Sequence, residues 1–168
     1  YVLLNQQDDL NSMFTLAHEM GHAIHTYHSN KAQPFVYSGY LIFVAEVAST
    51  CNECLLNHYL LEHETEENKR NYILNHYLEN FRTTLFRQTM FAEFEKITHE
   101  MYAKGESLTA ERLCAVYMDL NRKYFGEEMV SDPQIALEWA RIPHFYTPFY
   151  VYQYATGYSA AVSLSANR

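Results

Sequence analysis

Two histidines and a glutamate form the pattern in this sequence that is best suited to chemistry. The segment His18-Glu19-Met20-Gly21-His22 has the form H-E-x-x-H, in which the two imidazoles are four residues apart. On a helix, residues four apart lie on one face about one turn from each other, so both rings can bind one ion, and the pattern is typical of zinc. Glu19 points about a quarter-turn away, where it can hydrogen-bond a water held on that ion. The spacing therefore separates the ligand role from the general-base role.

A catalytic zinc site needs a third protein ligand and an open fourth position for water. Glu46 is the strongest candidate, because it interrupts the apolar run from Leu41 to Ala48. An unpaired carboxylate buried in such a run would cost several kcal/mol, and an ion held by the two histidines would compensate its charge. The alternative is that Glu46 pairs with an arginine such as Arg82 or Arg87.

Two further histidines are alternative third ligands. His28 lies where H-E-x-x-H-x-x-G-x-x-H peptidases place a third histidine, but the glycine of that pattern is replaced here by His25. His25 itself is seven residues after His18, about 10 Å along a helix axis, which is far for one tetrahedral centre. Glu53 follows Glu46 by two turns on the same helical face, where it either orients a ligand histidine or is a solvated surface residue.

The elements that must position these residues are expected to be helices. Glycine and proline are scarce, with 5 and 4 of 168 residues, and such a shortage of chain breakers favours long helices over short strands. Apolar residues at three- and four-residue steps predict helices over 10–27, about 38–61, 74–101, 110–125 and 133–139. Leu41 to Ala45 is apolar on all sides and is expected to be buried. We therefore predict an all-α fold, with H-E-x-x-H on one helix and Glu46 on the next.

Composition excludes several classes of partner. Twelve basic against twenty acidic residues give a net charge of -8 without any basic run, so nucleic acids and anionic membranes are poor partners. No apolar stretch is long enough to span a membrane. Three cysteines are too few for a disulfide scaffold, which favours a reducing compartment and hence the cytoplasm. Cys51 and Cys54 have C-x-x-C spacing but no second pair, so we interpret them as core or incidental cysteines.

Three ordered motifs together resemble the oligoendopeptidase F branch of the thimet-oligopeptidase-like zinc peptidases. They are His18–His25, Phe43–Ser49, and His144 with the tyrosine-rich segment Tyr150–Tyr158. The resemblance covers nearly the whole chain. It implies a helical zincin-type catalytic domain with one zinc ion per chain. It also implies that Glu46 is the third ligand and that short, unstructured peptides are cleaved within a deep channel.

The same resemblance implies roles for residues near the end of the chain. In that family, a histidine and one or more tyrosines contact the substrate and stabilise the tetrahedral intermediate, and the matching positions are His144, Tyr154 and Tyr158. Tyr150 is an alternative to Tyr158, because the spacing around Tyr158 differs by about one residue from the family pattern. Phenol and imidazole groups near a dry zinc site can donate hydrogen bonds to an oxyanion, so the chemistry fits.

The leading hypothesis is a zinc metalloendopeptidase that cleaves short oligopeptides, with metal ligands His18, His22 and Glu46. Glu19 would then assist attack by the zinc-bound water. We expect residues 1–168 to form one catalytic domain of a longer chain. We expect these residues to lack the N-terminal helical region and the C-terminal end of that longer chain. The alternative is a catalytically incompetent helical module that binds metal in this truncated form. A di-iron helical bundle is disfavoured, because the sequence has no second E-x-x-H.

Overall fold

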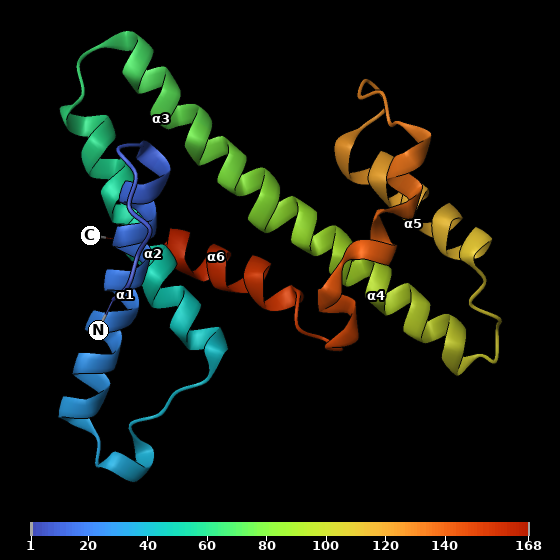
Figure 1. Ribbon diagram of the computed structural model, residues 1–168, viewed down its shortest axis with the longest axis horizontal. Helices are drawn as coiled ribbons and strands as arrows, with labels where there is room; N and C mark the ends of the chain where they lie inside the picture. The colour runs from blue at the N-terminus through green and yellow to red at the C-terminus, as the bar shows by residue number, and fades with distance from the viewer. Residues whose placement is uncertain (1, 168) are drawn as a thin grey trace. The chain divides into compact units, whose positions relative to one another are not determined.

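The computed structural model describes residues 2–167, and within them every regular element is a helix. The α-helices are α1 (Leu10–Ala32), α2 (Ile42–His63), α3 (Glu67–Asn80), α4 (Arg87–Ala103), α5 (Ala110–Phe125) and α6 (Tyr152–Ser165) (Figure 1). Short 3₁₀ helices are η1 (Phe35–Tyr37), η3 (Pro133–Arg141) and η4 (Pro143–Tyr146), and η2 (Phe81–Phe86) is π-helical. The all-α prediction is confirmed. None of the helices described combines the length and the apolar character that a membrane span requires.

Helix α1 is longer than the sequence pattern predicted. The Asp9 side chain caps it by accepting a hydrogen bond from the Ser12 backbone N–H at 2.7 Å. At the other end it continues past residue 27 to Ala32. Gln33 then takes an extended conformation, with φ -120° and ψ 147°, because the proline that follows it disfavours helical geometry. The helix therefore ends just before Pro34, and not where its apolar periodicity ends.

The long helix predicted over residues 74–101 is three consecutive segments. α3 ends at Asn80, the π-helical turn η2 follows, and α4 begins at Arg87. Apolar residues at steps of three and four are compatible with both windings, so periodicity alone does not reveal a π turn. By contrast, α5 has the predicted bounds: the Thr109 side chain accepts from the backbone N–H of Arg112 at its start, and Gly126 follows its end.

The apolar start of α2 is not buried, and that expectation is wrong. Leu41 is 78% exposed and the next three side chains are also exposed, whereas Ala45 is only 6% exposed. The helix begins at Ile42 rather than near residue 38. Within α2 the buried residues are Ala45, Ser49, Cys54 and Asn57, so burial begins only at the fourth residue of the helix. Apolar residues on every face of the first turn of α2 are thus not sufficient for its burial.

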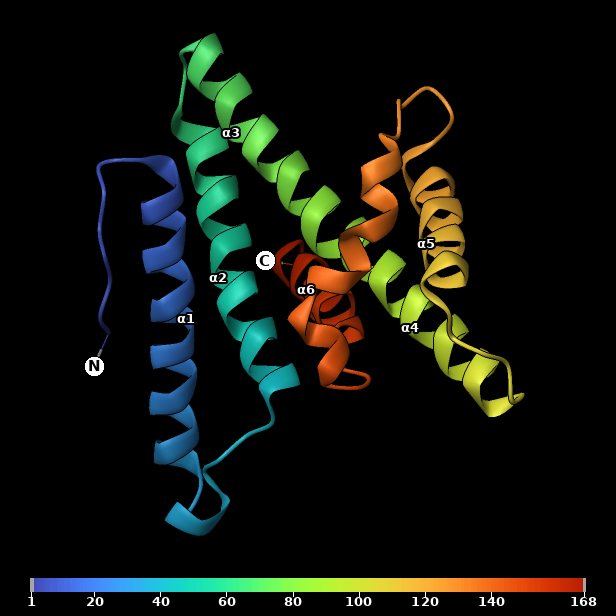
Figure 2. The ribbon, with the colours of Figure 1, turned by 45° about the vertical axis from the view of Figure 1, so that its right-hand side comes forward.

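Contacts between Cα atoms divide the chain into two compact units, residues 1–81 with 156–168, and residues 82–155. In the first unit, α1 and α2 run antiparallel, side by side (Figure 2). In the second, α4 packs against α5, and α5 packs against η3. The core of this second unit consists of Met90, Phe91, Phe94, Tyr117, Leu120, Ile142 and Val151. The expectation that residues 1–168 form one catalytic domain stays a prediction.

Helices α1 and α2 approach closely where Gly21 faces Ser49. A Cβ atom added at Gly21 would lie 2.5 Å from the Ser49 Cα and 3.1 Å from the Ala48 carbonyl oxygen. Because these are backbone atoms, no side-chain rotation could relieve the overlap. One turn away, the Asn52 side chain donates a hydrogen bond to the Ala17 carbonyl oxygen at 2.6 Å. Gly21 therefore sets the distance between the two helices that carry the candidate metal ligands.

We predict that Gly21→Ala destabilises the protein by about 1 to 3 kcal/mol, because the added methyl group pushes the two helix backbones apart. The same movement should weaken zinc binding, since it draws Glu46 away from the histidines. Denaturant unfolding and zinc titration measure the two effects. Gly157→Ala is the matched control: its Cβ would meet α2 only at 3.8 Å or more, which is ordinary contact. Equal behaviour of the two variants would contradict the prediction.

Candidate metal centre

The side chains of His18, His22 and Glu46 come together on facing sides of α1 and α2. The two histidine Nε2 atoms are 3.1 Å apart. Glu46 places its Oε2 3.4 Å from the His18 Nε2 and its Oε1 3.9 Å from the His22 Nε2. Of the histidine, cysteine and acidic side chains that the structure describes, these three make the only group with metal-ligand spacing.

This donor set fits zinc. Zinc binds histidine nitrogen and carboxylate oxygen at about 2.0 to 2.2 Å in tetrahedral geometry, which puts neighbouring ligand atoms about 3.3 to 3.5 Å apart. The three measured separations, 3.1, 3.4 and 3.9 Å, lie close to that spacing. Two neutral nitrogens and one carboxylate are also the ligand types of zinc sites that keep a fourth position open. The three residues could therefore hold one zinc ion with small adjustments.

Glu53 contacts the opposite nitrogen of the first histidine. Its Oε1 lies 2.5 Å from the His18 Nδ1. This hydrogen bond is the main reason that the pKa of His18 is raised above its ordinary value, against the opposing effect of burial. A proton held on Nδ1 leaves the Nε2 lone pair directed at Glu46 and His22, and a carboxylate partner makes it a stronger ligand. Of the two roles considered for Glu53, the contact favours orientation of His18.

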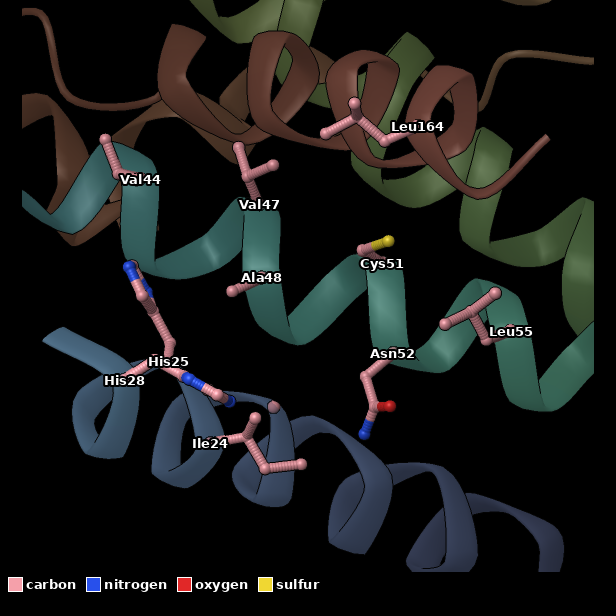
Figure 3. A pocket seen from close by; sticks show the side chains of 11 residues that line it. Ile24, His25, His28, Val44, Val47, Ala48, Cys51, Asn52, Leu55 and Leu164 are labelled. Carbon is pink, nitrogen blue, oxygen red and sulfur yellow. The ribbon is translucent and has the colours of Figure 1, made fainter. Parts of the chain in front are cut away.

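His25 and His28 do not join this group. The His25 ring stacks on Tyr40 with ring centroids 3.9 Å apart, and the His28 ring lies edge-on to Tyr27. Both histidines line an apolar groove of about 410 Å³ formed by α1, α2 and the C-terminal part of α6 (Figure 3). The α2 residues in this groove, such as Val44 and Ala48, are not those that face His18.

One of the two arginines considered as a partner for Glu46 forms an ion pair with a different carboxylate. Arg87 donates to the Glu138 Oε1 at 2.6 Å, and the Tyr117 hydroxyl donates to Oε2 at 2.6 Å. Burial works against the Glu138 charge, but these hydrogen bonds outweigh it and lower the pKa of Glu138 below its ordinary value. Arg87 is therefore committed to Glu138. The Glu46 side chain is 29% exposed, so its desolvation is smaller than the sequence suggested.

Two of the predicted catalytic residues meet in the second unit. The Tyr154 hydroxyl is 3.4 Å from the His144 Nε2. Tyr150 packs on both, with ring centroids 5.8 Å from His144 and 5.5 Å from Tyr154. In this contact one group accepts from the other, and a phenol and an imidazole can each also donate a hydrogen bond to a developing negative charge.

The other two predicted residues lie in the first unit. Glu19 is partly buried on α1, next in the chain to His18. Tyr158 is only 6% exposed and packs edge-on against Phe81, with ring centroids 5.0 Å apart. Its hydroxyl finds no hydrogen-bond partner among the described residues and borders a small cavity that Glu53 and Asn57 also line. Burial raises the pKa of Tyr158, so the hydroxyl stays protonated at neutral pH.

Comparison with known proteins gives one consistent family. The model of peptidase family M3 matches residues 1–167. Oligopeptidase PepF of Bacillus subtilis is 60% identical over 166 residues, which are 99% of this chain and 25% of that protein. The chromosomal oligoendopeptidase F of Lactococcus lactis subsp. cremoris is 53% identical over 161 residues, 96% of this chain and 27% of that protein.

A solved structure extends the agreement to the fold. The crystal structure of oligoendopeptidase-F from Enterococcus faecium superposes with a TM-score of 0.82 at 49% identity. The match covers 94% of this chain and 28% of that one. The chain therefore spans about a quarter of the length of the relatives it matches.

Removing Glu46 should remove the candidate centre. We predict that Glu46→Ala weakens zinc binding by more than about 100-fold, because a direct ligand should matter more than the outer partners whose loss costs 10- to 100-fold. Elemental analysis and chelator competition measure the change, with the exposed Glu67→Ala as control. Full zinc retention would reject Glu46 as the third ligand.

Removing Glu53 should have a smaller, graded effect. We predict that Glu53→Leu weakens zinc binding about 10- to 100-fold, because the His18 ring loses the acceptor that fixes its orientation. Glu53→Gln should lie between this variant and the wild type, since its amide oxygen can still accept the hydrogen bond. The same chelator competition measures both. Equal affinities for the leucine variant and the wild type would show that the contact does not act on the ligand.

Proposed function

The chain belongs to peptidase family M3, and we propose from this premise that it carries the zinc-dependent catalytic centre of an oligopeptidase. The proposed reaction is hydrolysis of peptide bonds within short oligopeptides, with one zinc ion per chain. The observation that carries the proposal is the convergence of His18, His22 and Glu46, with separations of 3.1 to 3.9 Å. The names of the relatives support the substrate class.

In the proposed mechanism, a bound zinc ion would supply Lewis-acid chemistry at the scissile carbonyl and at the attacking water. The chain's own residues divide the remaining work. His18 and His22 would hold the ion from one face of α1, and Glu46 would supply the compensating negative charge from α2. Glu19 accepts the proton of the attacking water and later delivers it to the leaving amine. Its place beside His18, but turned away from the ligand face, suits that role.

His144 and Tyr154 are proposed to donate hydrogen bonds to the oxyanion of the tetrahedral intermediate. Their contact at 3.4 Å supports the proposal, because each group can hold the other in a defined orientation. A donor aimed at the developing charge contributes about 2.7 to 4 kcal/mol in comparable sites. Tyr158 joins this set by resemblance. Its buried, protonated hydroxyl can donate only to a group that reaches the cavity beside Glu53.

A cytoplasmic location is part of the same proposal. All three cysteines, Cys51, Cys54 and Cys114, are free in the structure. Free cysteines are typical of proteins kept in a reducing compartment. Burial raises the pKa of Cys54 to about 11, so this thiol stays protonated and is poorly reactive at neutral pH.

The decisive test changes Glu19 alone. We predict that Glu19→Gln lowers kcat for a short internally quenched peptide by about 100- to 10,000-fold, because the amide cannot accept the proton. Zinc content, measured by elemental analysis, should stay at the wild-type value. Glu67→Gln, which alters an exposed glutamate on α3, should leave both quantities unchanged.

Two results would reject parts of the proposal. A Glu19→Gln variant that cleaves at the wild-type rate would reject the general-base assignment. A zinc-loaded wild-type protein that cleaves no short peptide would favour the alternative, a helical module that binds metal without catalysis.

A further inference from the structure

The backbone of Phe149 adopts a conformation that phenylalanine rarely takes. Its φ is +59°, and it is the only residue other than glycine with a positive φ in residues 2–167. Bulky side chains are disfavoured there because the Cβ crowds the backbone. Such a conformation persists only where the surroundings impose it. Pro148 precedes it, and proline followed by a residue of positive φ is the order typical of a type II turn, where glycine is normally found.

A buried carboxylate holds this turn. Glu95, on α4, is only 5% exposed, and its Oε1 accepts a hydrogen bond from the Phe149 backbone N–H at 2.6 Å. A hydrogen bond to an ionised acceptor is stronger than one between neutral groups. The two residues are 54 positions apart in the chain, so the contact ties the turn to the helix that carries much of the unit's core. The His99 ring, one turn further along α4, also contacts the Phe149 ring, with centroids 4.9 Å apart.

The turn lies between His144 and Tyr154, the two residues proposed for oxyanion stabilisation. His144 precedes it in η4, whereas Tyr150 follows it directly and Tyr154 follows in α6. The Tyr150 ring stacks on His144 at 5.8 Å, so the chain must reverse direction within the five residues between them. With a less tight turn at Phe149, Tyr150 and Tyr154 would not reach His144 in this arrangement.

We propose that Glu95 is a positioning residue for catalysis, which holds Phe149 in its left-handed conformation and thereby sets Tyr150 and Tyr154 against His144. The inference rests on the proposed function, because it assigns a purpose to the His144 and Tyr154 pair. It adds a residue that touches neither metal nor substrate. All the residues involved belong to the unit formed by residues 82–155.

The first experiment removes the acceptor in the full-length enzyme. Glu95→Leu should lower kcat about 10- to 100-fold, with a smaller change in KM and unchanged zinc content, because small misplacements of catalytic groups carry penalties of that size. Glu95→Gln should retain most activity, since its amide oxygen can still accept the Phe149 N–H. Leu120→Ala, a core change on α5 of the same unit, is the control for lost stability. It should lower the unfolding temperature without lowering kcat below that temperature.

The second experiment tests whether the backbone conformation is what matters. Glycine adopts a positive φ freely, so Phe149→Gly should restore most of the kcat lost in Glu95→Leu. Phe149→Ala also removes the ring but keeps the Cβ, so it should give no rescue. Phe149→Ile, made with Glu95 intact, should lower kcat by adding strain. This last variant tests the proposal even if Glu95→Leu fails to fold.

A spectroscopic readout separates failure of this inference from failure of the proposed function. The ring signals of His144, labelled and assigned by their loss in His144→Gln, report the neighbouring tyrosine rings. They should shift in Glu95→Leu and return in the Phe149→Gly double variant, whether or not the protein cleaves peptides. An active wild type with unchanged kcat and His144 signals in Glu95→Leu would overturn the inference, as would equal rescue by alanine and glycine. An inactive wild type with the expected shifts would overturn only the proposed function.

Discussion

The close approach of α1 and α2 at Gly21 is the constraint on which the metal centre depends. Two histidines on one helix supply only half of a tetrahedral site, and the third ligand must come from a different part of the chain. Glu46 reaches them because the backbones meet where a Cβ atom would not fit. The Asn52 contact with the Ala17 carbonyl oxygen locks the same crossing by a directional bond. Glycine within H-E-x-x-H thus acts through packing rather than through ligand chemistry.

The partly or fully buried carboxylates make two kinds of contact. Glu53, Glu95 and Glu138 each accept hydrogen bonds from donors far away in the sequence, and so tie together segments that packing alone would leave less defined. Glu46 differs, since it faces two imidazole nitrogens at 3.4 and 3.9 Å. Nitrogens with lone pairs repel a carboxylate unless a proton or a cation lies between them. This arrangement favours a positively charged occupant.

Much of the fold could be predicted from the sequence, and the errors have identifiable causes. Helix identity follows from local periodicity and from the scarcity of glycine and proline, so α1, α2 and α5 were found. The π turn η2 was missed because one extra residue per turn scarcely alters an apolar pattern. Leu41 to Ala45 was expected to be buried because burial was inferred from composition, whereas exposure depends on which faces other elements cover. Glu95 was missed, although it stands among core residues of α4 much as Glu46 stands in its apolar run.

The sequence by itself determined the chemistry available to this protein: two imidazoles one helical turn apart, a carboxylate beside them, and a resemblance that names the family. These features are local, because helical spacing converts residue order directly into geometry. Only the tertiary structure decided which of Glu46, His25 and His28 meets the histidine pair. It likewise brought Glu53 to His18 and Glu95 to Phe149. Those contacts join residues 24 to 54 positions apart, and the distance between such residues is set by how helices pack, which no local pattern encodes.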